Sequence, residues 1–262
     1  VVIMDICKNC LEPIPESQIY CSMKCWQEHR NPPSQVSEES RPTLNTSEWI
    51  KAQAKAWGSI IGMFFSLFIL LLVIATFIED FQLYLISSTI ILSIFVFLVL
   101  RYVYDSNEIT KLLKFPKTID TWKLIGIALA IDIFVVKPLH VAISFHFFPD
   151  LQEQEVITAL EEMSQISAII TAFSVSILTP ILEELLFRGF ILGMFLKCYN
   201  EKVAILLSAI IFAIVHEPVA IGMAFGGGLI YGWLRVRTGS IVPSTLLHIF
   251  WNSFVSIIVI IY

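Results

Sequence analysis

Two adjacent glutamates and an arginine stand inside one of the chain's apolar stretches. Glu183, Glu184 and Arg188 occur in the run ILTPILEELLFRGFILGMFL, which holds no other charged residue. Ionisable side chains in a lipid bilayer are costly unless they are paired, so such residues are functional candidates. On a helix, Glu184 and Arg188 are four residues apart and can neutralise each other, whereas Glu183 points about 100° away. The segment is either a structural ion pair with a spare carboxylate or a base held beside an ion pair.

Two further apolar stretches carry histidines. His216 ends the run FAIVH, and His248 and Asn252 lie one helical turn apart in the run HIFWN. A single histidine in such a run is more often a packing residue than a catalyst. Counted at about 1.5 Å per residue from the nearest polar helix ends, however, all three clusters lie roughly 14 to 21 Å along their helices. This shared depth favours one common site.

The elements that hold these residues are long and apolar. The chain is 56% hydrophobic and 15% charged, with a mean hydropathy of +0.79, whereas soluble domains are about 25% charged. A membrane span needs about 20 apolar residues. Seven runs qualify or come close: 57–78, 81–100, 124–147, 165–187, 203–217, 219–234 and 241–261. We expect an all-α polytopic membrane protein with seven transmembrane helices, partnered by lipid and not by nucleic acid.

The basic residues predict how the chain is oriented in the membrane. Apart from Lys137, Lys and Arg lie in alternate segments: before residue 56, in 101–123, in 188–202 and in 235–237. The intervening gaps at 79–80, 148–164 and 217–218 hold eight acidic residues and no Lys or Arg. Because basic residues favour cytoplasmic loops, we expect a cytoplasmic N-terminus.

Four cysteines near the N-terminus have the spacing of a metal site. Cys7, Cys10, Cys21 and Cys25 form a C-x2-C-x10-C-x3-C pattern, and four thiolates suit a tetrahedral structural zinc. The alternatives are a disulfide pair or a chance grouping, but a cytoplasmic location argues against disulfides. We therefore expect a zinc ribbon over residues 1–30, followed by a flexible linker and juxtamembrane segment over 31–56.

Taken in order, the three polar motifs resemble those of a known family. EELLFR, FAIVH and HIFWN are similar to the EExxxR, FxxxH and HxxxN motifs of the CPBP family, the CAAX-processing and bacteriocin-processing membrane proteases, which includes the CAAX endopeptidases of the Ras-converting type. The resemblance covers residues 165–258; the ribbon and the N-terminal transmembrane helices over 57–147 lie outside it. It implies an intramembrane endopeptidase acting on membrane-associated peptide or protein substrates.

The resemblance also implies roles for the polar residues. Glu183 with His216 would activate a water, while His248 and Asn252 would bind the oxyanion or help hold a metal. The Glu184–Arg188 pair would position the base. Whether a catalytic zinc takes part stays open. Glu183, His216 and His248 would suit zinc, yet the chain has no HExxH spacing.

Two other functions fit the same residues. A catalytically idle relative could serve as a membrane scaffold or a bacteriocin-immunity factor. A secondary transporter could use buried acids and histidines as an ion relay, although the chain shows none of the inverted-repeat symmetry common in transporters. A cytoplasmic ribbon joined to this core favours a bacterial or archaeal cell membrane, and a cytoplasmic protein partner for the ribbon.

Two secondary features have a structural and a functional interpretation. Asp132, Lys137 and His140 lie beside Pro138 in the third run, where they could pair structurally at a kink or line a polar cavity; we favour pairing.

Five glycines, at 222, 226, 227, 228 and 232, could let helices approach closely or leave room for a substrate strand. We favour close packing.

The cysteine pattern leads to a test of the ribbon. Replacing Cys7 and Cys10 by serine should release about one zinc per chain and unfold residues 1–30, because metal binding supplies the folding free energy of such small modules. Zinc content is measured on the purified protein by elemental analysis. Proteolysis in membranes should change little, since the ribbon lies outside the region of resemblance. Complete loss of proteolysis in a properly inserted double variant would contradict a purely recruiting or regulatory ribbon.

Overall fold

The computed structural model describes residues 4–6, 13–15, 46–78, 81–115, 118–147 and 164–261. The chain divides into two compact units, Val1–Trp49 and Ile50–Tyr262. The first contains an antiparallel pair of short strands, β1 (Met4–Ile6) and β2 (Pro13–Pro15). The four cysteines of the expected zinc ribbon lie outside the described residues.

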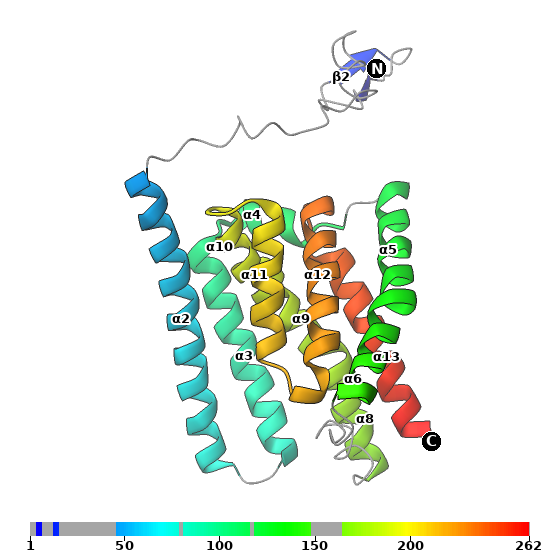
Figure 1. The fold of residues 1–262 in the computed structure, drawn as a ribbon. Coiled ribbons are helices and arrows are strands. Elements are labelled where there is room, and N and C mark those ends of the chain that lie inside the picture. Colours follow the sequence, from blue (N-terminus) through cyan, green and yellow to red (C-terminus); the bar gives the residue numbers. More distant parts are fainter. Residues whose placement is uncertain are drawn as a thin grey trace. The chain divides into compact units, whose positions relative to one another are not determined.

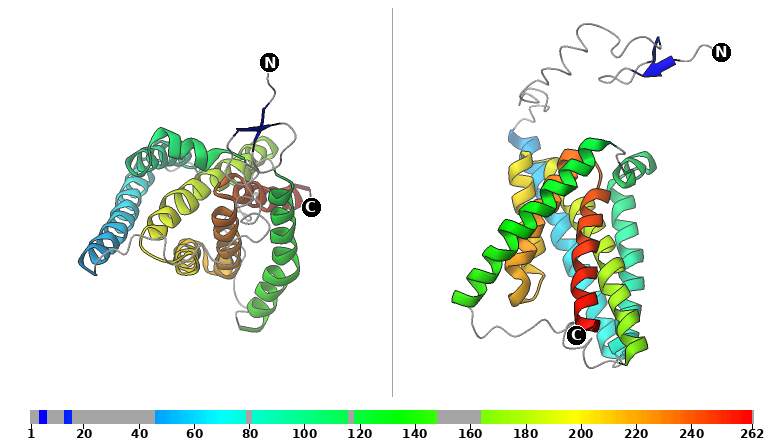
Figure 2. Two further views of the ribbon diagram at one scale, coloured as in Figure 1. Left: turned by 90° about the horizontal axis from the view of Figure 1, so that it is seen from above. Right: turned by 90° about the vertical axis from the view of Figure 1, so that its right-hand side faces the viewer.

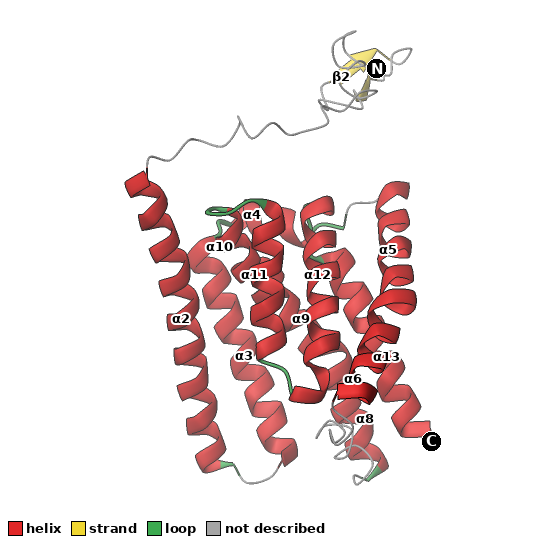
Figure 3. Ribbon diagram, in the orientation of Figure 1, coloured by secondary structure: helices red, strands yellow, loops and turns green. Residues whose placement is uncertain are grey.

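From Thr46 onward the described chain is helical (Figures 1 and 3). The α-helices are α2 (Thr46–Phe77), α3 (Phe81–Val103), α4 (Ser106–Leu113), α5 (Ile119–Ile131), α6 (Lys137–Phe147), α8 (Gln165–Phe173), α9 (Thr179–Glu184), α10 (Leu192–Leu196), α11 (Glu201–Ile214), α12 (Ile221–Thr238) and α13 (Val242–Ile261). Three π-helical segments, η2 (Asp132–Val136), η3 (Ser174–Leu178) and η4 (Leu185–Ile191), join some of them end to end. A 3-10 turn, η5 (Pro218–Ala220), precedes α12.

Each of the seven predicted apolar runs falls on a helix, but not every helix is long enough to cross a membrane. Among the described residues, five helical stretches are long and apolar enough, or six if the bent pair Ser87–Val103 and Ser106–Leu113 forms one span. The expected span at 203–217 is the 14-residue helix α11, about 21 Å long. The first helix also begins earlier than expected, at Thr46, within the segment expected to be a linker.

The short helix α4 was not expected from the sequence. It begins with a capping box, in which the Asp105 side chain accepts from Glu108 N at 2.8 Å and the Glu108 side chain accepts from Asp105 N at 3.0 Å. This reciprocal pair satisfies backbone donors at the helix start. At its other end, the Leu112 carbonyl accepts hydrogen bonds from Ser240 Oγ (3.1 Å) and Ile241 N (3.0 Å). Helix α4 therefore holds the turn that leads into α13.

The π-helical segments tie helices together through their carbonyls. Val175 O accepts a hydrogen bond from Asn252 Nδ2 at 3.0 Å, and Gly189 O accepts one from the Tyr104 hydroxyl at 2.8 Å. Phe187 O likewise accepts from Ser208 Oγ at 3.2 Å. π-Helical turns interrupt the regular α-helical ladder and are common at functional sites. The helix that carries the glutamate pair is thus hydrogen-bonded to α11, to α13 and to the residue that follows α3.

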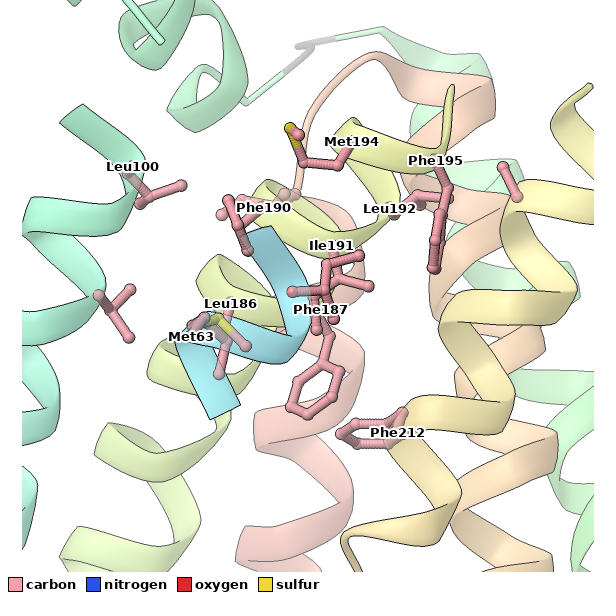
Figure 4. Close-up of a cluster of buried hydrophobic side chains, with 14 of the residues drawn as sticks. Met63, Leu100, Leu186, Phe187, Phe190, Ile191, Leu192, Met194, Phe195 and Phe212 are labelled. Carbon is pink, nitrogen blue, oxygen red and sulfur yellow. The ribbon is translucent and has the colours of Figure 1, made fainter. Parts of the chain in front are cut away.

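The largest hydrophobic core surrounds η4 and α10. Phe187, Phe190, Leu192 and Phe195 are at most 3% exposed, and they meet side chains of α2, α3 and α11, including Phe212 (Figure 4). Viewed from above, α11 and α12 lie side by side (Figure 2). This packing fixes the C-terminal half of the glutamate-bearing helix.

Close packing explains most of the glycines in α12. A Cβ added at Gly228 would lie 3.0 Å from Ala209 Cα in α11, and one at Gly232 would lie 3.0 Å from the Ile205 side chain. A Cβ added at Gly222 would lie 2.6 Å from His140 Nδ1, and one added at Gly226 would overlap the Val136 side chain. These four glycines therefore bring α12 close to α11 and to the α5–α6 helix.

Gly228 should be the most sensitive of these positions, because an added methyl group would meet backbone that cannot move aside. We expect Gly228→Ala to cost about 1–3 kcal/mol, as is usual for overpacking, and to lower the unfolding temperature in detergent. Gly227→Ala is the matched control. Its Cβ would make an ordinary 3.4 Å contact with Tyr231, and alanine favours helix formation. Equal stability of the two variants would show that the α11–α12 contact is not tight.

Candidate active site

Glu184 is the most buried charged residue of the site. Its side chain is 0% exposed, and its Oε1 lies 3.0 Å from Arg188 Nη1. Its Oε2 accepts a hydrogen bond of 2.6 Å from Ser244 Oγ on α13. A buried carboxylate is stable only when it is paired and hydrogen-bonded. Glu184 therefore links Arg188 in η4 to Ser244 in α13.

Arg188 is held by two aromatic rings as well as by Glu184. Its Cζ lies 4.2 Å from the centroid of the Phe212 ring and 5.1 Å from that of Tyr231. A guanidinium over aromatic faces is stabilised by the ring quadrupoles. Its Nε and Nη2 have no hydrogen-bond partner among the described residues. The two ring contacts and the ion pair with Glu184 must therefore offset the cost of burying the guanidinium charge.

His248 lies between the two carboxylates. Its Nδ1 is 3.4 Å from Glu184 Oε1 and its Nε2 is 3.6 Å from Glu183 Oε2. Its ring stacks on Tyr231 at 5.0 Å with an interplanar angle of 25°. Glu183 is the accessible member of the pair, with 22% of its side chain exposed. Glu184 and Tyr231 therefore hold the imidazole from two sides, and Glu183 is the more exposed of the two carboxylates that it contacts.

His216 lies just beyond the end of α11, where its side chain folds back on the helix. Its Nδ1 is 2.6 Å from Phe212 O, and a carbonyl oxygen can only accept. Nδ1 therefore carries a proton in this contact. In the neutral ring, Nε2 is then free to accept a proton.

Asn252 is anchored by its amide. Asn252 Nδ2 donates to Val175 O at 3.0 Å, and the backbone O of Asn252 accepts from Ser176 Oγ at 3.2 Å. An amide nitrogen has two hydrogens, so one remains available for a ligand. The π-helical turn η3 supplies the carbonyl that sets this orientation.

A cavity of about 190 Å³ joins these side chains. It is large enough to hold several water molecules. His216, His248 and Asn252 all line it. Glu183 is not among the lining residues but contacts one of them, His248. The remaining lining residues are Asp132, Lys137, Val175, Phe212, Ala220, Met223, Ala224, Gly227, Tyr231, Trp251, Val255, Ser256 and Val259. Residues of two sequence motifs, FAIVH and HIFWN, thus line one space, and the EELLFR motif adjoins it through the contacts of Glu183 and Glu184 with His248.

Asp132 and Lys137 form an ion pair on the wall of the same cavity. Lys137 Nζ lies 3.8 Å from Asp132 Oδ2 and 3.9 Å from the centroid of the Trp251 ring. The π-helical bond from Lys137 N to Asp132 O spans five residues and brings both side chains to one side. The structural pairing favoured from the sequence is present, and the pair also faces the cavity. His140 is not a lining residue; it contacts Ser144 Oγ at 3.5 Å.

Sequence reasoning missed three residues of the site. Ser244 bonds to Glu184, Tyr231 stacks on His248, and Ser256 accepts a hydrogen bond of 2.8 Å from Ser176 Oγ. A signal existed for the serines, because Ser244, His248, Asn252 and Ser256 recur every four residues and so share one face of α13. No comparable signal marked Tyr231.

The residues expected for a catalytic zinc do not gather as a ligand set. Among the residues that the structure describes, no three His, Cys, Asp or Glu side chains are placed to share a metal ion. Glu183 and His248 are close, and His216 could offer only its Nε2 to a metal, because its Nδ1 donates to the Phe212 carbonyl.

Because the two glutamates are buried to different extents, we expect their glutamine variants to differ in thermal stability. Glu184→Gln should leave Arg188 buried without its counter-charge and cost about 3–5 kcal/mol of stability. Glu183→Gln, the same change one residue earlier, should unfold near the wild-type temperature, because its side chain is partly exposed. Thermal unfolding of both variants in one detergent measures the difference. Equal losses would show that the two carboxylates do not have separate roles.

Comparison with known proteins places this site in a protease-related segment. Residues 165–254 match the family model described as type II CAAX prenyl endopeptidase Rce1-like. That segment holds all three polar motifs of the site. No solved structure matches the chain.

Three bacterial relatives match part of the chain. The Bacillus subtilis protein named "Putative membrane peptidase YdiL" is 32% identical over 117 residues, which is 44% of this chain and 48% of the relative. An Escherichia coli protein of 24.3 kDa is 31% identical over 30% of this chain and 40% of its own length. The protein YxdF of Lactococcus lactis is 30% identical over 35% of this chain and 51% of its own.

The chain therefore spans about half the length, or less, of the curated relatives it matches. The likeness is to a domain and not to a whole protein. Several helices long and apolar enough to cross a membrane agree with a membrane peptidase at family level. This chain carries, in residues 165–254, a segment similar to the Rce1-like type II CAAX prenyl endopeptidases.

Proposed function

We propose that residues 165–258 form an intramembrane endopeptidase that hydrolyses peptide bonds of membrane-associated substrates. The observation that carries this proposal is the position of His248 between Glu183 and Glu184, on the wall of a cavity that His216 and Asn252 share. Peptide hydrolysis needs an activated water, a proton donor for the leaving amine and a stabiliser for the oxyanion. This set of side chains supplies all three.

In the first step, a water in the cavity attacks the scissile carbonyl carbon. Glu183 takes one proton from the water as the new C–O bond forms, with His216 Nε2 as the second acceptor that orients the water. The carbonyl π electrons move to its oxygen, giving a tetrahedral oxyanion. The free N–H of Asn252 stabilises that oxyanion as a preorganised donor.

In the second step, the intermediate collapses. The C–N bond breaks, and Glu183 returns the proton to the leaving amine, so that it acts first as base and then as acid. Its 3.6 Å contact with His248 Nε2 keeps the carboxylate directed at the cavity. Glu184 and Arg188 act through His248 and are positioning residues.

The substrate class follows from the setting and not from the match alone. A cavity in a bundle of apolar helices suits peptides that are already held at the membrane by a span or a lipid anchor. We propose CAAX-type or peptide-maturation processing as the biological reaction. An idle scaffold, an immunity factor and an ion-coupled transporter are the outcomes that a direct assay separates from it.

The assay uses the full chain, purified in detergent and incubated with a peptide library whose products are identified by mass spectrometry. Glu183→Gln should reduce turnover about 100-fold to 10,000-fold, because a general base typically accelerates a reaction by that factor. Glu201→Gln is the control, since Glu201 is an exposed acid in the first turn of α11.

Two results would contradict the proposal. Unchanged cleavage by Glu183→Gln would show that this carboxylate is not the proton acceptor. If the folded wild-type protein cleaves no peptide, the scaffold or immunity-factor hypothesis is favoured instead. If the same protein shows ion-coupled uptake in liposomes, it is a transporter.

A further inference from the structure

We infer that Lys137, held against the Trp251 ring, is a binding site for a carboxylate group of the substrate on the wall of the candidate active site. The inference deepens the proposed function and rests on it for the word substrate. Lys137 lies outside residues 165–254, the segment that matches the family model. The carboxylate is that of a peptide C-terminus or of an acidic side chain, since both present the same pair of oxygens.

A π-helical turn between α5 and α6 brings Lys137 to the cavity. The Lys137 N–H donates to Asp132 O, five residues earlier in the chain. The next residue, Pro138, has no N–H to donate, so the helix cannot keep its regular ladder at this point. Turns of this kind are common at functional sites. Both Asp132 and Lys137 consequently line the cavity.

The two members of this ion pair are not equally buried. The Asp132 side chain is 3% exposed, whereas that of Lys137 is 30% exposed. Lys137 Nζ lies 3.8 Å from Asp132 Oδ2, a distance longer than the roughly 2.7–2.9 Å of a charge-assisted hydrogen bond. A lysine ammonium has three N–H donors. A second carboxylate can therefore bind to Lys137 beside Asp132.

Trp251 fixes the position of the Lys137 amino group. Nζ lies 3.9 Å from the centroid of the Trp251 ring, where a cation is attracted to the ring face. Trp251 belongs to α13 and stands between His248 and Asn252 in the sequence. One helix therefore holds the amino group in place and carries two residues of the candidate active site. A carboxylate bound at Lys137 lies in the same cavity as the peptide bond to be cleaved.

The rest of the cavity wall explains why this amino group would decide which peptides bind. Among the described residues that line the cavity, Lys137 is the one Lys or Arg, and several others, such as Val175, Met223 and Val255, are apolar. A carboxylate loses its hydration in such a space, at a cost that only a cation or hydrogen-bond donors can offset. The site therefore selects peptides with a carboxylate near the cleaved bond over their neutral analogues.

Binding of matched peptides tests the site without relying on proteolysis. The probes are three N-myristoylated tetrapeptides: Gly-Val-Ile-Ala with a free C-terminus, the same peptide as a C-terminal amide, and Gly-Val-Glu-Ala as the amide. The full chain carries Glu183→Gln throughout, so that the probes stay intact, and affinities are measured in detergent by microscale thermophoresis. We expect the free acid to bind at least about tenfold more tightly than its amide, because hydrogen bonds between charged groups are the stronger ones. Equally tight binding of the glutamate-containing amide would identify side-chain carboxylates as a second source, and weak binding would identify the C-terminus alone.

Variants of the ion pair assign the preference to Lys137. The double variant Asp132→Asn/Lys137→Met removes the amino group without leaving a buried carboxylate unpaired, and it should abolish the preference for the free acid. Lys137→Arg keeps a cation and should retain it. The matched control is Asp120→Asn/Lys123→Met, which makes the same two changes in an exposed ion pair of α5 and should leave the preference unchanged. Thermal unfolding checks that each variant is folded.

Two results would overturn the inference. One is equal affinity for the three probes, or no binding of any of them, a comparison that needs no variant of the ion pair. The other is a preference for the free acid that survives in Asp132→Asn/Lys137→Met. The peptide-library assay separates the site from the proposed function. A carboxylate preference without cleavage by the wild-type chain would reject the peptidase and keep the site, whereas cleavage without the preference would keep the peptidase and reject the site.

Discussion

A buried ion pair is the constraint on which the rest of the site depends. Glu184 and Arg188 are together in a water-excluded core, 3.0 Å apart and at most 1% exposed. Two such charges lose their hydration, and their mutual attraction offsets part of that loss, although Arg188 Nε and Nη2 have no hydrogen-bond partner among the described residues. Further support comes from Ser244, which bonds to Glu184, and from the rings of Phe212 and Tyr231, which lie against Arg188. Because they come from three other helices, the pair can exist only when α11, α12 and α13 are packed around it.

The same requirement explains why the reactive groups sit where they do. His248 follows Ser244 by one helical turn, so the bond that satisfies Glu184 also places the imidazole against both carboxylates. Asn252 follows by one more turn and meets the carbonyl that η3 leaves available. The polar face of α13 therefore performs two tasks. Its first residue stabilises the charged core, and its later residues line the cavity.

Local spacing allowed part of this arrangement to be predicted. Glu184 and Arg188 pair as four-residue spacing requires, and His248 and Asn252 face the same cavity. The roles assigned to these side chains remain predictions. Tyr231 and the π-helical turns could not be foreseen, because their places follow from contacts between distant helices. The count of seven spans is not confirmed among the described residues, because the apolar run at 203–217 forms a helix of only 14 residues, and hydropathy does not fix where a helix ends.

Helix α11 has a further consequence for the surrounding lipid. Its 14 residues extend about 21 Å, against a hydrocarbon core of about 30 Å. Leu206, Ile210 and Ile214 point outward, so lipid chains must match the short helix by local thinning of the bilayer. The headgroup layer then dips toward His216. Thicker membranes would draw that layer away, which makes the hydration of the cavity depend on acyl-chain length.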